Sequence, residues 1–462
     1  MFKMDADFTF SDNISEREME KFVGIEIYST PELKGIGGIY KHSYKDFIVR
    51  EITENGIILE FGEEESPTME ISVPKYKYTT FNLVKVNRDT FDSVRLLSKA
   101  LKIPSEIIGY AGLKDKCSLS VQRVSIPGNY IEKLRKLNIR DIFIRDISLS
   151  KKAVRLGNNW GNKFIITIRN VGFEFKEKNR VEEIISKINQ FGFPNYYGLQ
   201  RFGTFRPNSH LIGRYLLEDN FKKAYEEFVL NTYSTELDIS RKVRTELKVT
   251  GNLEKAYDEF PKSLNYERDL IKYLLDHPND YEGAINNLPS YLIKLIISSF
   301  QSYLFNKLLS LRIQEGFSLF NPVKGDIISI LDDIDGQITQ AKYTYGGSYD
   351  EFLKEAINLN RASIVIPLIG YDTELDEYPF VKPLLIKILQ MEQIDPDIFN
   401  HELLKTHDFK GSFRSMVLKP KDLNLINIEH DELFPNKIKI KIECSLSKGS
   451  YATMLLREIM KM

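Results

Sequence analysis

The sequence is poor in the residues and segments that would place the chain in several common protein classes. Its 462 residues include two cysteines, Cys117 and Cys444, a single Trp, and no C-x-x-C or paired His spacing. Such cysteines support neither a disulfide framework nor a structural zinc site, which indicates a reducing compartment. No run approaches the ~18 apolar residues of a membrane span, and the acidic N-terminal residues form no secretion signal. These absences predict a soluble, cytoplasmic protein.

Composition and charge describe a globular chain without selecting a ligand. Hydrophobic residues make up 42% and aromatic residues 12%, and the length predicts two or three domains. The formal net charge is -1, but eleven Lys or Arg stand against four Asp or Glu between residues 114 and 155. This stretch is a candidate basic face for a polyanion, although a solvated surface is the simpler explanation. No G-x-G-x-x-G or Walker loop is present to hold a nucleotide.

The hydrophobic pattern divides the chain into β-rich ends and a helix-rich middle. Strands are predicted where β-branched and aromatic residues alternate or run together, at 46–52, 76–87, 120–127 and 163–171. Helices are predicted where apolar residues recur every three or four positions, at 90–103 with Thr90 as N-cap, 210–230, 266–277, 290–314 and 348–359. Residues 436–462 predict a strand, a turn at Lys448 and Gly449, and a helix. We expect an α+β fold with an inserted middle domain, in which the last strand rejoins the first sheet.

The stretch "GLKDK" (112–116) places Asp115 between two lysines, just after two glycines. Glycine permits a tight, exposed turn, and Lys114 and Lys116 would lower the pKa of the carboxyl group in a partly buried site. Such an Asp can act as a nucleophile or a general base. Because most Asp residues in such turns are simply solvated, the pattern alone does not decide between the two interpretations.

A second unusual stretch, "NYYGLQRFG" (195–203), fits neither a regular strand nor a helix. Its aromatic rings can stack on a nucleobase, and its amides can hydrogen-bond the edge of the base. An aromatic-rich turn packed under a sheet explains it equally well. Near the C-terminus, "SYAT" (450–453) places Tyr451 at a turn before a helix, where Ser450 or Thr453 can serve as a cap.

Seven stretches, taken in order, resemble the TruD-type family of tRNA pseudouridine synthases. They are "GIGGIYKHSYKDFIVREI", "FNLVKVNRDT", "GYAGLKDKCSLSVQ", "FPNYYGLQRFG", "FQSYLFNKLL", "VIPLIGYD" and "SKGSYATMLLRE". The resemblance runs from about residue 22 to the end, and the richness in Ile, Lys and Tyr resembles archaeal members. It implies an α+β pseudouridine-synthase catalytic domain, with a mostly antiparallel mixed sheet flanked by helices, and a helix-rich inserted TRUD domain. The implied parts are residues 1–220 and 396–462 for the catalytic domain and 221–395 for the insertion.

The resemblance, carried over residue by residue, also implies a site. It places the catalytic residue at Asp115 and its cationic partner at Lys41, with Lys114 as a second choice. The implied substrate-binding residues are Phe47, Asn195, Tyr197, Gln200, Arg201 and Tyr451. Asp115 would act at the ribose of a flipped uridine, by attacking C1′ or by removing the C2′ proton; Phe47 and Tyr451 would wall the base, and Asn195 would bond it as it turns. Cys117 stands where the family commonly has a basic residue.

The implied substrate is tRNA, with the uridine at position 13 of the D-arm as the leading site. Position 35 of tRNA and other RNAs are alternative targets. The reaction needs no metal and no nucleotide or other cofactor, no membrane is expected as a partner, and a monomer is slightly favoured. Two other classes of function are a catalytically silent RNA-binding protein on the same fold and a phosphate-handling enzyme that uses "GLKDK" as a loop.

Overall fold

The computed structural model describes residues 15–62, 77–172, 175–203, 205–332, 337–348 and 350–461, with the side chains of 175–177 excepted. The chain divides into two compact units. Unit 1 comprises Met1–Ser29 and Pro194–Val417, and unit 2 comprises Thr30–Phe193 and Leu418–Met462. The domain boundaries expected from the sequence, at 220/221 and 395/396, do not coincide with the boundaries of these two units. They stay a prediction.

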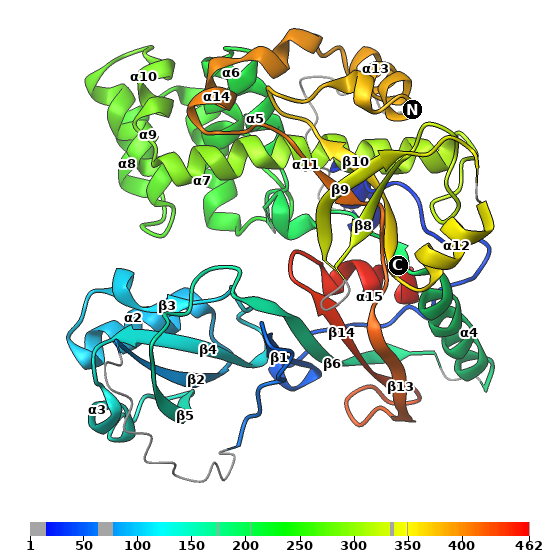
Figure 1. The fold of residues 1–462 in the computed structure, drawn as a ribbon. Coiled ribbons are helices and arrows are strands. Elements are labelled where there is room, and N and C mark those ends of the chain that lie inside the picture. The colour runs from blue at the N-terminus through cyan, green and yellow to red at the C-terminus, as the bar shows by residue number, and fades with distance from the viewer. Residues whose placement is uncertain are drawn as a thin grey trace. The chain divides into compact units, whose positions relative to one another are not determined.

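Unit 2 is built on a mixed sheet of eight strands within the described residues. The strand order is β13-β14-β6-β1-β4-β2-β5, with β3 beside β4 (Figure 1). Every neighbouring pair is antiparallel except β1 and β4, which are parallel. The strands are β1 (Phe47–Thr53), β2 (Tyr78–Val86), β3 (Gly109–Tyr110), β4 (Leu119–Pro127), β5 (Ile142–Ser150), β6 (Asn159–Val171), β13 (Lys421–His430) and β14 (Ile438–Ser447). The expected mostly antiparallel mixed sheet is therefore confirmed.

The C-terminal strand rejoins the first sheet, as the sequence predicted. β14 pairs antiparallel with β6, from Ile438 opposite Val171 to Ser447 opposite Gly161. Its alternation of Ile and Lys sets the register, because every second side chain of a strand points to the same face. Ile438, Ile440 and Ile442 are buried, whereas the lysines between them are partly exposed.

Helices of unit 2 flank this sheet. They are α2 (Thr90–Leu101), α3 (Ile131–Arg135), α4 (Phe175–Phe191) and α15 (Ala452–Met460), with short 3-10 turns η1 (Tyr44–Asp46) and η2 (Ser105–Ile107). Apolar side chains of α2 join those of β2 and β4 in one core cluster. The N-cap prediction at Thr90 is wrong: the cap is Asp89, whose carboxylate accepts from the Asp92 N–H, while the Thr90 hydroxyl bonds to Gln122.

Unit 1 contains most of the helices. They are α1 (Glu16–Phe22), α5 (Ser209–Leu217), α6 (Phe221–Tyr225), η4 (Glu226–Leu230), α7 (Asp238–Thr250), α8 (Leu253–Glu259), α9 (Asn265–Asp276), α10 (Tyr281–Asn286), α11 (Ser290–Gln314), α12 (Asp350–Asn358), α13 (Val381–Glu392) and α14 (Glu402–Thr406), with 3-10 turns η3 (Leu199–Arg201), η5 (Leu375–Glu377) and η6 (Pro396–Asn400). The long helix α11, at the predicted bounds 290–314, runs through the unit with α5 and α13 against it (Figure 1).

A four-stranded antiparallel sheet in unit 1 was not anticipated. Its order is β11-β10-β8-β9. The strands are β8 (Ile327–Leu331), β9 (Ile338–Thr344), β10 (Ala362–Leu368) and β11 (Ser412–Ser415). β8 and β10 are short, nearly continuous apolar runs, "IISIL" and "ASIVIPL", and periodicity cannot separate such runs from a buried helical segment. A two-residue pair, β7 (Phe193–Pro194) with β12 (Val417–Leu418), completes the strands of the described residues.

Candidate active site

The strand pairing of unit 2 explains why Lys41 and Asp115, far apart in the sequence, lie together. β1 and β4 are parallel, with Ile48 opposite Leu119. The segments that lead into two adjacent parallel strands arrive at the same edge of the sheet. Lys41 precedes β1 and Asp115 precedes β4, so this one pairing assembles the predicted pair.

Lys41 and Asp115 form an ion pair. Lys41 Nζ lies 2.5 Å from Asp115 Oδ2, and 55% of the Asp115 side chain is exposed. The Lys41 backbone is left-handed, with φ at 55°, a conformation that non-glycine residues adopt rarely. The structure therefore presents an open carboxylate with one ammonium group directly beside it.

Lys114, the second choice for the cationic partner, has a different partner in the structure. Its Nζ lies 2.7 Å from Glu51 Oε2, and both side chains are almost fully buried. Glu51 also accepts from the Arg123 N–H at 3.0 Å. The Lys114 ammonium thus belongs to a buried ion pair inside the sheet and not to the Asp115 carboxylate.

The loop that carries Asp115 (residues 112–118, the Asp115 loop) is held by buried side chains from neighbouring elements. Thr90 Oγ1 accepts from the Lys114 N–H at 2.9 Å, and Gln122 Nε2 donates to Gly112 O at 3.2 Å. Within the loop, the Ser118 hydroxyl donates to Asp115 O at 2.7 Å. These bonds fix the backbone on both sides of Asp115 and leave its carboxylate outside the network.

Lys85, which the sequence analysis did not select, lies beneath the same loop. Its fully buried ammonium donates to Ser120 Oγ at 2.9 Å, to Arg88 O at 3.0 Å and toward Lys114 O at 3.5 Å. Burial, aided by the Lys114 charge and opposed by nearby carboxylates, lowers the pKa of Lys85 to about 7. A lysine inside the apolar strand "FNLVKV" was a signal that the sequence contained.

Cys117 links the two segments that meet at this edge. Its Sγ lies 3.4 Å from Lys41 O, within reach of a weak S–H hydrogen bond. The thiol thus contacts the backbone of the residue whose side chain pairs with Asp115. The other cysteine, Cys444, is buried in β14, and burial raises its pKa to about 12, which suppresses thiolate chemistry.

Phe47 is only 2% exposed. The Lys41 ammonium lies 4.3 Å from the centre of its ring, and Phe164 meets the ring edge-on at 5.8 Å. Phe47 therefore has the position of an inward-facing aromatic residue at the start of β1. Its contact with Lys41 adds a cation–π interaction that supports the ion pair.

Tyr451 lies in the same unit, at the N-cap of α15 directly after β14 and its turn. Its side chain is partly exposed. Strand order places β14 two strands from β1, on the far side of β6.

The other predicted residues lie in unit 1, on the segment 195–201 (the Asn195 segment), where they are held by one face of α11. Ser302, Asn306 and Ser310 are spaced by four residues and so share a face of the helix. The Ser302 hydroxyl accepts from Arg201 Nε at 3.1 Å. Asn306 accepts from the Tyr197 N–H through Oδ1 at 2.9 Å and donates to the Tyr197 carbonyl through Nδ2 at 3.0 Å. The Ser310 hydroxyl is hydrogen-bonded to the Tyr196 hydroxyl at 2.9 Å. A polar stripe in an otherwise apolar helix was a further signal in the sequence.

Asn195 is buried, and both ends of its carboxamide are bonded. Its Oδ1 accepts from Arg414 Nη2 at 2.5 Å, and its Nδ2 donates to Ser415 O at 3.0 Å. The Arg414 guanidinium also lies 4.2 Å from the centre of the Tyr197 ring. No motif in the sequence pointed to Arg414.

Tyr197, Arg201 and Gln200 differ in their exposure. The Tyr197 ring is buried, with the Arg201 guanidinium 5.7 Å from its centre and Phe305 edge-on at 5.5 Å. Arg201 is half-buried and Gln200 is exposed on η3. The alternative interpretation of this stretch as an aromatic-rich packed turn therefore describes the two tyrosines, although they pack on α11.

The basic stretch between residues 114 and 155 is mostly at the surface. Lys114 and Arg123 are tied into buried or half-buried networks. The exposed members are Lys116, Lys133, Arg135, Lys136, Arg140, Lys151, Lys152 and Arg155. Unit 2 thus carries exposed positive charge on α3 and on the loops beside β5 and β6.

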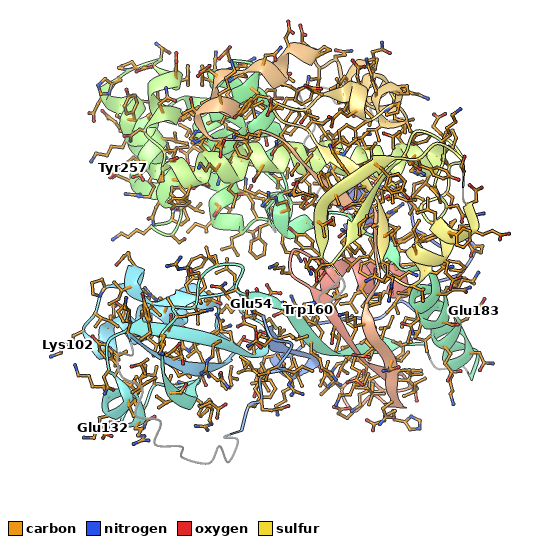
Figure 2. All side chains as sticks on the ribbon, in the orientation of Figure 1. Glu54, Lys102, Glu132, Trp160, Glu183 and Tyr257 are labelled. Atoms are coloured by element: carbon orange, nitrogen blue, oxygen red, sulfur yellow. The ribbon has the colours of Figure 1, made fainter. Side chains whose placement is uncertain are left out.

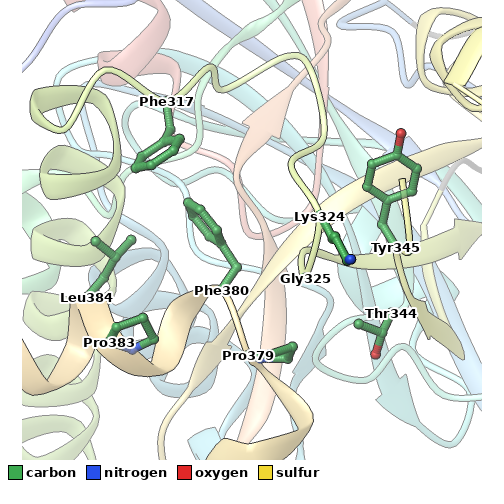
Figure 3. A pocket seen from close by; sticks show the side chains of 10 residues that line it. Phe317, Lys324, Gly325, Thr344, Tyr345, Pro379, Phe380, Pro383 and Leu384 are labelled. Atoms are coloured by element: carbon green, nitrogen blue, oxygen red, sulfur yellow. The ribbon is translucent and has the colours of Figure 1, made fainter. Parts of the chain in front are cut away.

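A pocket of about 540 Å³ in unit 1 is lined by ten residues between Phe317 and Leu384, and it contains none of the predicted site residues (Figure 3). Phe317 and Phe380 meet edge-on at 4.9 Å on one side. Its lining is largely apolar, with Lys324 as its one charged residue. The arrangement offers little acid–base chemistry.

The described residues contain no group of three or more His, Cys, Asp or Glu that could hold a metal ion. No helix in that part of the chain is both long and apolar enough to cross a bilayer.

Comparison with known proteins defines the class of this chain. A family model described as tRNA pseudouridine synthase D (TruD) matches residues 22–459. A Methanosarcina acetivorans protein named "Probable tRNA pseudouridine synthase D" is 33% identical over 448 residues, 96% of this chain and 97% of the relative. A Methanocaldococcus jannaschii protein named "Probable tRNA pseudouridine synthase D 1" is 33% identical over 426 residues, covering 92% and 96%.

A solved structure is also similar to this chain, in both sequence and fold. A crystal structure from Methanosarcina mazei, described as that of the "Putative tRNA pseudouridine synthase D (TruD)", is 32% identical to this chain with a TM-score of 0.78, over 97% of this chain and 99% of that one. The chain therefore belongs to the tRNA pseudouridine synthase D (TruD) family, and its class of activity is that of the pseudouridine synthases, which are isomerases.

Proposed function

We propose that this protein converts a uridine of tRNA to pseudouridine, with the uridine at position 13 of the D-arm as its target and Asp115 as the group that acts at the ribose. The observation that carries the proposal is the ion pair between Lys41 and Asp115, on a loop whose backbone is hydrogen-bonded to the side chains of Thr90 and Ser118. The choice of tRNA as the substrate follows the names of the relatives, which are tRNA pseudouridine synthases.

The reaction is an isomerisation. The bond between N1 and C1′ breaks, a bond between C5 and C1′ forms, C5 loses a proton and N1 gains one. Substrate and product have the same composition, so the balance requires no cofactor. An ionised carboxylate serves either route at the ribose: attack on C1′, or removal of the C2′ proton.

Lys41 supports this chemistry electrostatically. Its ammonium group lies 2.5 Å from the Asp115 carboxylate and places a positive charge beside it. The exposed side of Asp115 leaves room for a ribose, and the buried network beneath the loop limits its motion. Such preorganisation lowers the cost of reaching the reactive geometry.

The base requires separate handling, because uracil leaves the ribose and returns through another atom. We assign its hydrogen bonding to Asn195, and its walls to Phe47 and Tyr451, with Tyr197, Gln200 and Arg201 as further substrate-binding residues. In the structure Phe47 supports Lys41, so stacking on a base adds to that role. A stacked uridine must first leave its helix, at a cost of about a few kcal/mol, and phosphate contacts from exposed lysines and arginines offset this cost.

The test uses purified protein and a tRNA transcript that carries uridine at positions 13 and 35. Mapping of pseudouridine after incubation is expected to show conversion at position 13, and a transcript with cytidine at position 13 is expected to remain unmodified. Conversion at position 35 alone would refute the assigned target. Binding of the transcript without conversion at any position would instead identify a catalytically silent RNA-binding protein.

A further inference from the structure

The carboxamide of Asn195 can adopt only one orientation without losing hydrogen bonds. Its Oδ1 accepts from Arg414, and its Nδ2 donates to the Ser415 carbonyl. A reversed amide would set its N–H groups against the guanidinium donor and its oxygen against the carbonyl, and both bonds would be lost. Because Asn195 is only 6% exposed, water cannot readily replace them.

Arg414 is itself held in place. It lies on β11, opposite Ile366 of β10. Its Nε donates to Asn195 O at 3.2 Å while its Nη2 bonds Oδ1 of the same residue, so one guanidinium grips both the backbone and the side chain. The Tyr197 ring lies 4.2 Å from the guanidinium carbon. A lysine could not make this forked contact, because its ammonium is a compact point charge without the guanidinium fork.

The symmetry of the uracil ring explains how an amide of fixed orientation could bond the base both before and after it turns. Pseudouridine formation exchanges N1 for C5 at the ribose, which corresponds to a half-turn of the base about the line through N3 and C6. That turn exchanges the two carbonyl groups, so N3–H is flanked by a carbonyl on each side both before and after it. An amide that accepts from N3–H and donates to the neighbouring carbonyl therefore needs no reorientation.

We propose that Arg414 is a positioning residue, which fixes the Asn195 carboxamide so that it offers an acceptor and a donor to the imide edge of uracil in substrate and product alike. An amide has two N–H groups and two acceptor lone pairs, and the bonds to Arg414 and Ser415 use one of each. The remaining donor and acceptor match the imide edge. This inference rests on the proposed function, which assigns Asn195 to the base.

The experiment is a double-mutant cycle with Asn195→Ala, Arg414→Gln and the double variant, measured as single-turnover rates of pseudouridine formation at saturating tRNA. Each single variant is expected to lose about ten- to a hundredfold in rate, with tRNA affinity changed less than about threefold. The double variant is expected to be no slower than the slower single variant, because Arg414 acts through Asn195. Arg241→Gln, which removes an arginine from an exposed pair on α7, serves as the matched control at wild-type rate.

The outcomes separate the two proposals. A wild-type rate for Asn195→Ala overturns the role of Asn195 in the proposed function. A slow Asn195→Ala beside a wild-type Arg414→Gln overturns the positioning role alone, as do losses that multiply in the double variant. Should Arg414→Gln unfold at the assay temperature, Arg414→Lys replaces it in the same cycle. A wild-type rate for Arg414→Lys would also overturn the inference, since a lysine cannot make the forked contact.

Discussion

The Asp115 loop of unit 2 and the Asn195 segment of unit 1 present a polar side chain in opposite ways. In the Asp115 loop the backbone is fixed by Thr90, Gln122 and Ser118, and the carboxylate itself is exposed. In the Asn195 segment the side chain is buried, and both ends of its amide are bonded.

The difference follows from the work proposed for each group. A reactive carboxylate must approach the ribose and change its bonding during the reaction. Hydrogen bonds that hold the backbone of its loop and leave the carboxylate itself unbonded to that network therefore suit it best. A group that holds a turning base must keep its orientation, so fixing the amide itself serves it best. Substitution at Asp115 should therefore separate activity from stability, whereas substitution at Asn195 should reduce both.

The largest effect on stability is expected for Lys114→Met, because it leaves Glu51 as a buried charge without its partner. The free energy of unfolding should fall by about 3–5 kcal/mol. Trp160 is the single Trp of the chain and lies on β6 of unit 2 (Figure 2), so its fluorescence in urea reports on this unit. Lys382→Met, which breaks the exposed pair with Asp376, should cost less than about 1 kcal/mol by circular dichroism. A loss under 1 kcal/mol for Lys114→Met would contradict the stabilising role of the buried ion pair between Lys114 and Glu51.

A smaller, pH-dependent effect is expected at Lys85. Its pKa falls from the usual 10.5 to about 7 on folding, so between these values the unfolded chain binds the extra proton, and stability rises with pH. From pH 7 to pH 9 the wild type should gain about 2 kcal/mol of unfolding free energy relative to Lys85→Met. Trp160 fluorescence in urea at both pH values measures this difference. Lys99→Met, on the exposed face of α2, should follow the wild-type pH dependence, and identical curves for all three proteins would rule out the buried charge.

Asn195→Ala tests the stability of the Asn195 segment in unit 1. It removes the partner of the Ser415 carbonyl and of Arg414 Nη2, and the expected loss is about 1–3 kcal/mol. Thermal unfolding followed by circular dichroism measures it, because Trp160 lies in unit 2. Gln200→Ala, at an exposed position of the same segment, should change stability by less than about 0.5 kcal/mol. Equal effects of the two substitutions would remove the contrast between the regions.

The smallest effect on stability is expected for Lys41→Gln. The pair with Asp115 is half-exposed, so its loss should cost less than about 1 kcal/mol in urea unfolding. The rate of pseudouridine formation should nevertheless fall about ten- to a hundredfold, because the carboxylate loses its counter-charge. Lys45→Gln, four residues along and exposed, is the control and should keep the wild-type rate.

The sequence predicted local structure better than long-range pairing. The bounds of α11 and the return of the last strand to the first sheet followed from hydrophobic periodicity. Which lysine meets Asp115 could not follow from proximity in the chain, since adjacent Lys114 turns to Glu51 and distant Lys41 arrives through the parallel pairing of β1 with β4. The same limit applies to Arg414, which reaches Asn195 through the unpredicted sheet of unit 1.

The most direct measurement is the rate at which purified Asp115→Asn forms pseudouridine in tRNA, taken beside its urea unfolding by Trp160 fluorescence. The amide keeps the size of the side chain and removes the ionised carboxylate. We expect the rate to fall at least about a thousandfold while the free energy of unfolding stays within about 1 kcal/mol of the wild type. A wild-type rate would show that Asp115 is a solvated turn residue and that another group performs the chemistry.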